Sequence, residues 1–366
     1  MRHSKHLGFR RGPRISHNGG DQQRTRSRLM DTRLRQLSHW ASAQFLPAGQ
    51  ATLSVADFVS VSDDASFRRY FRCPKLDRAI VFMDAPPDKE PLQDFLAIGN
   101  ALSAAGVPAP EFFAVDLETG FLALSDFGDR QLLGLVQDEP DAVLSILSEV
   151  TGLLNTVARV DCTLPVYSES MLRAEMDLFP TWYLTRLLGL TLTDAFWPVW
   201  QDVCDRLVAS ALAEPQVFVH RDFHSRNIMV PSKGGLALLD FQDAVRGPLS
   251  YDLVSLLKDC YIEYEPWMQQ ELVEDYRQAW LSDPQVQAMT PIAFFQTFER
   301  MGLQRHLKCA GIFSRLCLRD GKSRYLNDIP MVMKYVATVC QSQPEFRDFF
   351  QWLQAFVLPD PMGRST

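Results

Sequence analysis

One segment, residues 217–241, constrains the fold of this chain more than any other. In it a polar loop, His220–Asn227, precedes two short apolar stretches, Ile228–Val230 and Leu236–Leu239, and a Gly-Gly pair lies in the turn between them. Apolar stretches of strand length around a glycine turn predict a β-hairpin. The predicted fold must therefore place a polar loop directly before a buried β-hairpin.

The hairpin brings together residues that are suited to phosphoryl transfer. Asn227 stands at one base of the hairpin, Asp240 at the other, and Asp222 lies in the loop that faces them. An amide and a carboxylate oxygen are suitable Mg²⁺ ligands, and Asp222 remains to accept a proton from a hydroxyl. The complete spacing, H-x-D-x₄-N-x₁₂-D from His220, is the pattern of phosphoryl-transfer enzymes. The alternative is an Asp that only caps a turn beside a hairpin.

The rest of the chain divides into a part rich in strands and a part rich in helices. Asp31 is the predicted N-cap of a first helix, and the periodic stripe Val143–Val157 begins a mostly helical remainder. Between them the pattern predicts strands at 67–72, 79–83, 111–116 and 120–124, and a helix at 91–105. We expect an α+β fold with a small β-rich N-lobe at 31–128, a hinge near 125–130, a large helical C-lobe at 129–358 and a tail at 359–366.

Charge and composition exclude several classes of protein. Residues 1–30 carry eight Lys or Arg and one Asp, a net charge of +7, whereas the whole chain has a net charge of −7. The rest of the chain is therefore strongly acidic. The acidic remainder gives no sign of a nucleic-acid surface, and no apolar run approaches the roughly 20 residues of a membrane helix. We interpret residues 1–30 as a basic disordered leader, with an upstream start and a true beginning near Met30 as one explanation and a nucleic-acid or membrane tail as the alternative. The seven cysteines form no C-x-x-C pair, which favours reduced thiols in a cytoplasmic protein.

The catalytic segment resembles the aminoglycoside phosphotransferase family of small-molecule kinases, which are relatives of the protein kinases. The resemblance implies a two-lobed, protein-kinase-like fold with ATP and Mg²⁺ in the cleft. It implies that Asp222 is the catalytic base and that Asn227 and Asp240 hold the metal. It also implies that His220 braces the loop and that Asp252, in the segment Gly247–Leu253, supports it through hydrogen bonds. Asp243 is equally compatible with a surface position and with a role in the site.

The nucleotide-binding residues are less clearly marked. The segment 62–70 occupies the position of the hairpin that covers phosphates, and the resemblance implies an adenine-binding hinge at residues 122–129. The candidates are Ser62, Ser66, Phe67, Arg68, Arg69, Met83, Ser125, Asp126, Phe127 and Gly128. Either segment is also compatible with an ordinary hairpin or turn. Met83 stands where the family usually has a lysine for the α- and β-phosphates, so Lys89, Arg69 or Arg72 is the substitute, or the chain is a nucleotide-binding pseudokinase.

The acceptor is indicated only by resemblance to a subgroup. The segments 63–72, 83–87, 220–227 and 303–316 resemble the bacterial cell-wall amino-sugar kinases, over about residues 31–358. This implies phosphorylation of the anomeric (C1) hydroxyl of N-acetylmuramate and N-acetylglucosamine in peptidoglycan recycling, a route linked to fosfomycin tolerance. Arg305, Lys308 and Arg315 are the acceptor-binding candidates; the alternative for this stretch is a helix with an exposed basic face. Aminoglycoside, choline- and homoserine-type kinases remain alternatives. We expect no nucleic-acid, membrane or obligate protein partner.

Overall fold

The computed structural model describes residues 19–61 and 67–358, with residues 19–31 described by their backbone alone. The described chain forms two compact units. The first comprises residues up to Pro91 together with Phe112–Ser125, and the second comprises Leu92–Glu111 and the chain from Asp126 onward. The helix at residues 93–104 therefore belongs to the second unit, although it lies between strands of the first in sequence.

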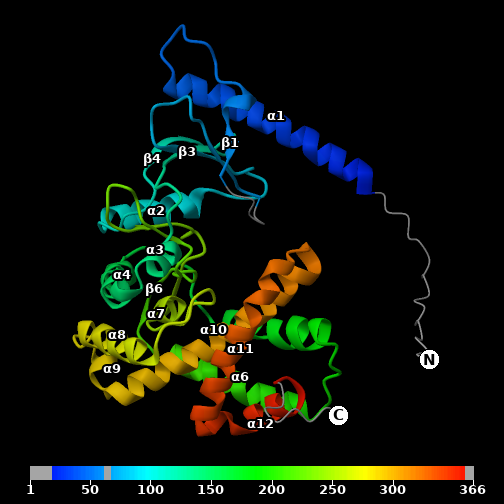
Figure 1. The fold of residues 1–366 in the computed structure, drawn as a ribbon, viewed down its shortest axis with the longest axis vertical. Coiled ribbons are helices and arrows are strands. Elements are labelled where there is room, and N and C mark those ends of the chain that lie inside the picture. The colour runs from blue at the N-terminus through cyan, green and yellow to red at the C-terminus, as the bar shows by residue number, and fades with distance from the viewer. Residues whose placement is uncertain (1–18, 62–66, 359–366) are drawn as a thin grey trace, which may run out of the picture. The chain divides into compact units, whose positions relative to one another are not determined.

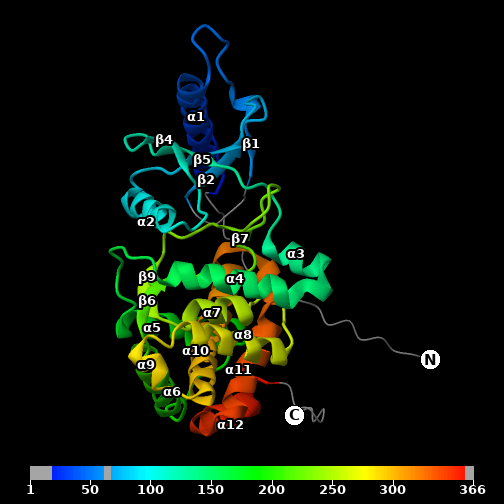
Figure 2. The ribbon, with the colours of Figure 1, turned by 90° about the vertical axis from the view of Figure 1, so that its left-hand side faces the viewer.

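The first unit is an antiparallel sheet covered by one helix. The sheet order is β1-β2-β3-β5-β4. The elements are α1 (Gly19–Phe45), β1 (Val59–Ser60), β2 (Arg69–Arg72), β3 (Ile80–Asp84), β4 (Phe112–Asp116) and β5 (Phe121–Ser125). Figure 2 shows α1 beside these strands. The four strands predicted from the sequence are confirmed. β3 and β5, which lie inside the sheet, are continuous apolar runs that are buried along almost their whole length.

Helix α1 packs through the apolar stripe that the sequence predicts. Leu37 and Ala41 are fully buried, and the Trp40 ring meets Phe82 of β3 edge-on, with 6.4 Å between centroids. The predicted start at Asp31 is wrong, because the helix begins at Gly19. The Gln-, Arg- and Leu-containing sequence between the two positions has good helix propensity and no proline, so the helix continues toward the N-terminus past Asp31.

A buried carboxylate ties α1 to the sheet. Asp84, at the end of β3, is fully buried. Its two oxygens accept hydrogen bonds from Arg33 of α1, with Nε at 2.7 Å, and from Arg69 of β2, with Nε at 3.1 Å. Both guanidinium groups also form ion pairs with it. Because Asp84 is out of water, these two arginines are needed to compensate its charge.

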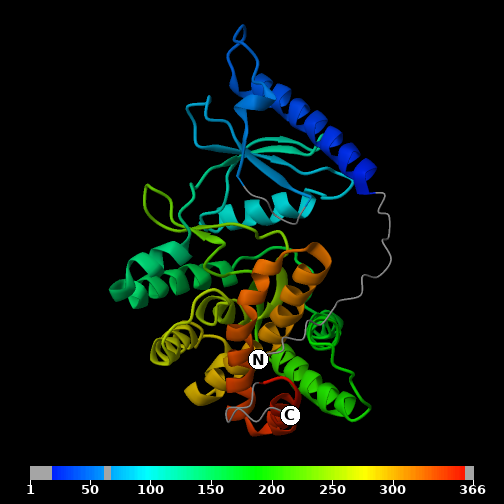
Figure 3. The same ribbon diagram turned by 45° about the vertical axis from the view of Figure 1, so that its right-hand side comes forward.

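The second unit is mostly helical. Its longer helices are α2 (Gln93–Ala104), α4 (Val143–Ala158), α6 (Phe196–Leu212), α8 (Pro266–Ala279), α10 (Pro291–Asp320) and α11 (Ile329–Ser342). Its shorter ones are α3 (Leu132–Asp138), α5 (Glu169–Met176), a π-helix (Phe179–Leu187), α7 (Tyr251–Leu257), α9 (Pro284–Gln287) and α12 (Arg347–Phe356). Helix α10 runs beside α11 (Figures 1 and 3), and together they form the centre of the unit.

Helix α4 is apolar enough to raise the question of a membrane span. The stretch Pro140–Ala158 has the length and a mean hydropathy, 1.2, that a membrane helix would also have, although the sequence predicts no span. In the structure the stripe of Leu147, Val150, Leu154 and Val157 is buried, and α4 packs against α7 and α8 (Figure 2). This amphipathic packing explains its composition within a folded unit.

Two small sheets frame the polar loop. Strand β6 (Gln216–Val219) pairs with β9 (Val245–Pro248), and β7 (Ile228–Met229) pairs with β8 (Ala237–Leu238). The predicted β7–β8 hairpin is confirmed. Strand β9 lies beyond the segment 217–241 and is not among the strands predicted from the sequence. Glycine and proline are uncommon in strands, so the Gly247-Pro248 pair does not suggest β9 in the sequence. The pair is tolerated because it lies at the end of the pairing with β6, where Gln216 is opposite Pro248.

Candidate active site

The polar loop between β6 and β7 is held in place by the first turn of α7. Asp252, which is 2% exposed, accepts hydrogen bonds from the backbone N–H groups of His220 at 2.6 Å and Arg221 at 3.0 Å. Burial raises the pKa of Asp252 to about 7, while the two N–H groups favour its charged form. Arg221 has φ 75°, a left-handed conformation that is unfavourable for a side chain of this size. The two hydrogen bonds stabilise this turn, and they are contacts that the family resemblance implies.

His220 braces the same loop from inside. Its side chain is fully buried, its Nε2 lies 2.9 Å from the Leu239 carbonyl oxygen, and the Asp222 N–H donates to its Nδ1 at 3.3 Å. Burial lowers the pKa of His220 to about 4, so the ring is neutral at pH 7. A neutral ring that accepts at Nδ1 carries its proton on Nε2 and donates it to Leu239. His220 thus links the loop to the β7–β8 hairpin.

Asp222 is a partly buried carboxylate in a positive environment. Burial on its own raises the pKa of Asp222, but the surrounding groups, Lys308 first, then His224 and Arg305, outweigh it and leave the pKa below its usual value. The carboxylate is therefore ionised at pH 7 and able to accept a proton. Lys308 and Arg305 belong to α10, more than eighty residues further along the chain.

The hairpin brings Asn227 and Asp240 to neighbouring positions. The Leu239 N–H donates to the Asn227 carbonyl oxygen at 2.9 Å, so Asp240 follows directly on the residue opposite Asn227. The Asn227 side-chain amide donates to the Asp222 carbonyl oxygen at 3.0 Å, which leaves its Oδ1 as the accepting atom. Asp240 is exposed, in a left-handed conformation with φ 65°, and its Oδ1 accepts from Gln242 at 2.7 Å.

These two residues fit a magnesium ion that is shared with phosphates. One amide oxygen and one carboxylate are the hard ligands that Mg²⁺ takes, with phosphate oxygens and water completing the shell. Within residues 32–61 and 67–358 no group of three or more His, Cys, Asp or Glu is placed to hold a metal. A bound Mg²⁺ would therefore depend on a phosphate ligand as well as on the protein.

A cluster that the sequence does not reveal lies next to the loop. We call it the Glu175 cluster: Glu175 of α5, which is 9% exposed, with Tyr167, Arg221 and Lys308 around it. Arg221 and Lys308 both form ion pairs with Glu175, the latter at 3.0 Å, and the Tyr167 hydroxyl donates to it. The cluster connects the loop to α10 through Lys308, which also donates to the Tyr251 hydroxyl of α7 at 3.0 Å.

The acceptor candidates of α10 are mostly buried. Arg305 is 3% exposed and Lys308 is 8% exposed, so the alternative of an exposed basic face is wrong for these two residues. The Arg305 guanidinium contacts the Cys260 and Cys309 sulfurs at 3.5 and 3.6 Å. Arg315 is half-buried two to three turns further on. Asp243 is exposed, and its carbonyl oxygen accepts from Arg221 at 3.3 Å.

The nucleotide-binding candidates of the first unit have different surroundings. Ser62 and Ser66 lie outside the described residues. Phe67 is exposed, and Arg68 is ion-paired with Glu90 at 3.0 Å. Arg69 is bound to Asp84, as described above, and Met83 is fully buried in β3, where it pairs with Tyr70 and Leu122.

The predicted hinge forms a tight turn after β5. Ser125 is the last residue of β5, and Ser125, Asp126 and Phe127 are all half-buried. The Gly128 N–H donates to Asp126 Oδ1 at 2.9 Å, and Gly128 has φ 83°, which favours glycine. The turn is thus stabilised by a hydrogen bond within it and by the glycine at its end.

Comparison with known proteins identifies the family. The model of the phosphotransferase enzyme family matches residues 57–295. The chain belongs to this family. A kinase of this family uses ATP. The fold class predicted from the sequence is confirmed, because solved structures of such kinases share the fold. A Plasmodium vivax ethanolamine kinase has a TM-score of 0.59 at 11% identity, covering 85% of this chain and 88% of its own. An ADP-bound aminoglycoside phosphotransferase has a TM-score of 0.54 at 12% identity, covering 83% and 98%.

Relatives of higher identity are amino-sugar kinases by name. An N-acetylmuramate/N-acetylglucosamine kinase of Pseudomonas aeruginosa is 40% identical over 331 residues, which cover 88% of this chain and 96% of the relative. A protein of the same name from Neisseria meningitidis is 38% identical over 82% of this chain and 91% of its own length. These similarities extend over nearly the whole phosphotransferase.

Proposed function

We propose that this phosphotransferase transfers the γ-phosphoryl group of ATP to the C1 hydroxyl of N-acetylmuramate and N-acetylglucosamine. The proposal is supported by the identity of about 40% to relatives of that name over most of the chain. The structural observation that carries it is the polar loop, in which Asp222 is partly buried within the influence of the Lys308 and Arg305 charges and accepts, at its carbonyl oxygen, from the Asn227 amide at 3.0 Å. The reaction belongs in the cytoplasm, where ATP is the donor, and the sugar 1-phosphate re-enters cell-wall synthesis.

Asp222 acts as the base in this proposal. It accepts the proton of the C1 hydroxyl while the sugar oxygen forms a bond to the γ-phosphorus and the bond to the ADP oxygen breaks. A lowered pKa makes Asp222 a weak base, which suits the anomeric hydroxyl because it is more acidic than an ordinary alcohol. His220 and Asp252 position the loop and do not touch the reacting atoms.

Asn227 and Asp240 hold Mg²⁺ in this proposal, with Oδ1 of Asn227 and the Asp240 carboxylate as ligands. When bound, the ion neutralises charge on the transferring phosphoryl group. In the first unit, Phe67, Arg68 and Arg69 contribute to nucleotide binding, and residues 125–128 border the adenine. Because Arg69 is ion-paired with Asp84, it contributes to nucleotide binding indirectly, by holding β2 and β3 together.

Arg305 confers recognition of muramate in this proposal. N-acetylmuramate differs from N-acetylglucosamine by a lactyl carboxylate, and a guanidinium binds carboxylates in bidentate fashion. Arg305 is buried, and its described hydrogen-bond partners are two sulfur atoms, which are weak acceptors. A carboxylate would therefore be a better partner than those it has.

The first experiment is ATP consumption by the purified chain with Mg²⁺ and each acceptor, with phosphorus NMR of the product. Both sugars are expected to give an anomeric 1-phosphate, and Asp222→Asn is expected to abolish it while ATP binding is retained. Chelation of Mg²⁺ is expected to stop turnover. Activity on kanamycin alone would contradict the acceptor assignment, and ATP binding without turnover on any acceptor would favour the pseudokinase.

A second experiment tests Arg305. Loss of a charge-assisted pair of roughly 1.5–3 kcal/mol predicts that Arg305→Met raises the KM for N-acetylmuramate about 10- to 150-fold and changes that for N-acetylglucosamine much less. Arg315→Met, on the same helix but half-buried, is the matched control. Equal effects of Arg305→Met on both sugars would refute the assignment.

A further inference from the structure

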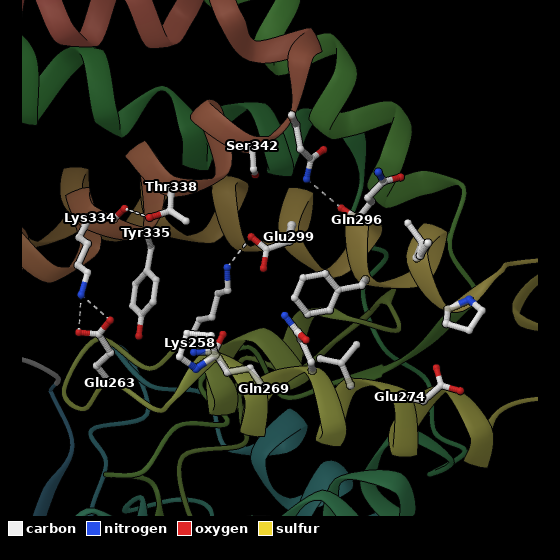
Figure 4. Close-up of a pocket in the computed structure, with 17 residues that line it drawn as sticks. Lys258, Glu263, Gln269, Glu274, Gln296, Glu299, Lys334, Tyr335, Thr338 and Ser342 are labelled. Carbon is white, nitrogen blue, oxygen red and sulfur yellow. Dashed lines mark hydrogen bonds and ion pairs between the residues drawn. The ribbon is translucent and has the colours of Figure 1, made fainter.

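A pocket of about 770 Å³ lies in the second unit between α8, α10 and α11. Figure 4 shows it, with Lys258 and Glu263 from the segment that follows α7, Glu299 from α10, and Tyr335 and Thr338 from α11. Asp222, Asn227 and Asp240 are not among its lining residues. The pocket is therefore distinct from the candidate active site.

The two sites lie on opposite sides of α10. Ile292, Phe295 and Glu299 line the pocket at spacings of three and four residues, which place them on one stripe of the helix. Lys308 is nine residues beyond Glu299, so at about 100° a residue it lies about 180° around the helix from it. One helix thus presents Lys308 to the catalytic loop and Glu299 to the pocket.

The charged groups in the pocket already have partners. Lys258 Nζ lies 2.6 Å from Glu299 Oε2, and Lys334 Nζ lies 2.6 and 2.8 Å from the two Glu263 oxygens. Glu274 is bound by Arg277. A phosphate or another ion would have to break one of these pairs, so the lining disfavours charged ligands.

The neutral polar groups are less well satisfied. Tyr335 is 5% exposed, and its hydroxyl has no hydrogen-bond partner among the described residues. Gln343 is 4% exposed; its amide nitrogen donates to the Gln296 carbonyl oxygen at 3.3 Å, but its Oε1 is equally without a partner within the described chain. Such buried groups are stabilised by a ligand that hydrogen-bonds to them. Phe295 and Val273 add apolar surface beside them.

The pocket is connected to the catalytic loop by three consecutive residues. The Lys258 carbonyl oxygen lies 3.0 Å from His306 Nε2, and the Asp259 carboxylate accepts from the Ser225 N–H at 2.9 Å. Cys260 contacts Arg305 at 3.5 Å. A shift of the segment 258–260 would therefore move a hydrogen-bond acceptor of the catalytic loop.

We propose that this pocket is a second binding site, for a neutral small molecule with amide and hydroxyl groups, and that its occupation is coupled to the catalytic loop through residues 258–260. An N-acetylated sugar and a short peptide amide share this chemistry. Coupling through the segment is reciprocal, so a ligand of the catalytic loop also alters affinity for the pocket. The inference does not depend on which acceptor is phosphorylated.

The test uses hydrogen exchange by mass spectrometry on the full chain. The probes are methyl N-acetyl-β-glucosaminide, whose blocked C1 oxygen cannot be phosphorylated, and N-acetyl-alaninamide, which separates a sugar from a peptide source. At least one probe is expected to slow exchange in peptides covering 258–264 and 335–343, and to change it in 220–227, where the Ser225 N–H reports the coupling.

Three variants complete the test. Tyr335→Phe is expected to weaken probe binding about five-fold, the value of one hydrogen bond. Thr338→Trp, at an exposed lining position, is expected to block binding. Tyr276→Phe removes a buried hydroxyl outside the pocket and should leave binding unchanged. The site would be refuted if neither probe slowed exchange at tens of millimolar, or if probe binding were unchanged in both Tyr335→Phe and Thr338→Trp. Protection of the pocket peptides without any change in 220–227 would overturn the coupling.

Discussion

Replacement of Asp252 by alanine tests how the catalytic loop is held. The carboxylate is buried and accepts two backbone hydrogen bonds, from His220 at 2.6 Å and from Arg221 at 3.0 Å. The alanine variant leaves both N–H groups without an acceptor in a place where water has little access. It also removes the support for the left-handed conformation of Arg221.

The size of the effect follows from these two contacts. A buried donor left without a partner costs about 1–3 kcal/mol, so Asp252→Ala is expected to lower the free energy of unfolding by roughly 2–6 kcal/mol. Asp252→Asn keeps one accepting oxygen and is expected to lose about half as much. If the loop relaxes by about 1 Å, turnover falls by about 100-fold.

Urea unfolding gives the free energies, and coupled ATP consumption gives the turnover. Ser255→Ala is the matched control on the same helix, because it removes only a hydroxyl that donates to the Tyr251 carbonyl oxygen at 3.1 Å. Its expected loss is about 1 kcal/mol or less. Wild-type stability and turnover in Asp252→Ala would show that the loop keeps its conformation without α7, and would refute this reasoning.

Two further predictions concern buried carboxylates. Glu175→Gln removes the charge that compensates Arg221 and Lys308, so it is expected to lower the free energy of unfolding by about 3–5 kcal/mol; a loss below about 1 kcal/mol in urea unfolding would contradict the role of the Glu175 cluster. Burial raises the pKa of Glu214, which accepts from the Ser250 N–H and hydroxyl, to about 8 from 4.5. Between these values Glu214 binds more protons in the folded chain than in the unfolded chain, so the stability that it contributes falls as pH rises from about 5 to 8. Glu214→Gln is expected to flatten this fall in thermal unfolding, and an unchanged slope would contradict the assigned cause.

The features that the sequence predicted well depend on neighbouring residues. The β7–β8 hairpin, the strands of the first unit and the buried stripe of α4 follow from periodicity and turn residues within short windows. Helix α2 ends at Ala104, one residue before the end of the helix predicted at 91–105. The spacing from His220 to Asp240 is also local, because the hairpin itself brings its two ends together.

The features that were missed depend on contacts between distant segments. Glu175 looks like any polar residue of an amphipathic helix, and only the fold brings it to Arg221 and Lys308. The same holds for Asp84, whose burial depends on α1 and β2 together. The burial of Arg305 and Lys308 could not be predicted, because a basic residue in a helix indicates an exposed face unless its partner is known.

The position of Lys308 in the chain has a consequence for how the enzyme is made. A ribosome completes the catalytic loop long before it reaches α10, and the intervening eighty or so residues take roughly 4–17 s to translate. During that interval Glu175 has only Arg221 of its two cationic partners, and Asp222 lacks the charges of Lys308 and Arg305. The emerging chain therefore cannot place Lys308 and Arg305 near Asp222 until α10 has left the ribosome. A messenger truncated before that helix would yield a product that holds the whole His220–Asp240 motif but lacks these two cations.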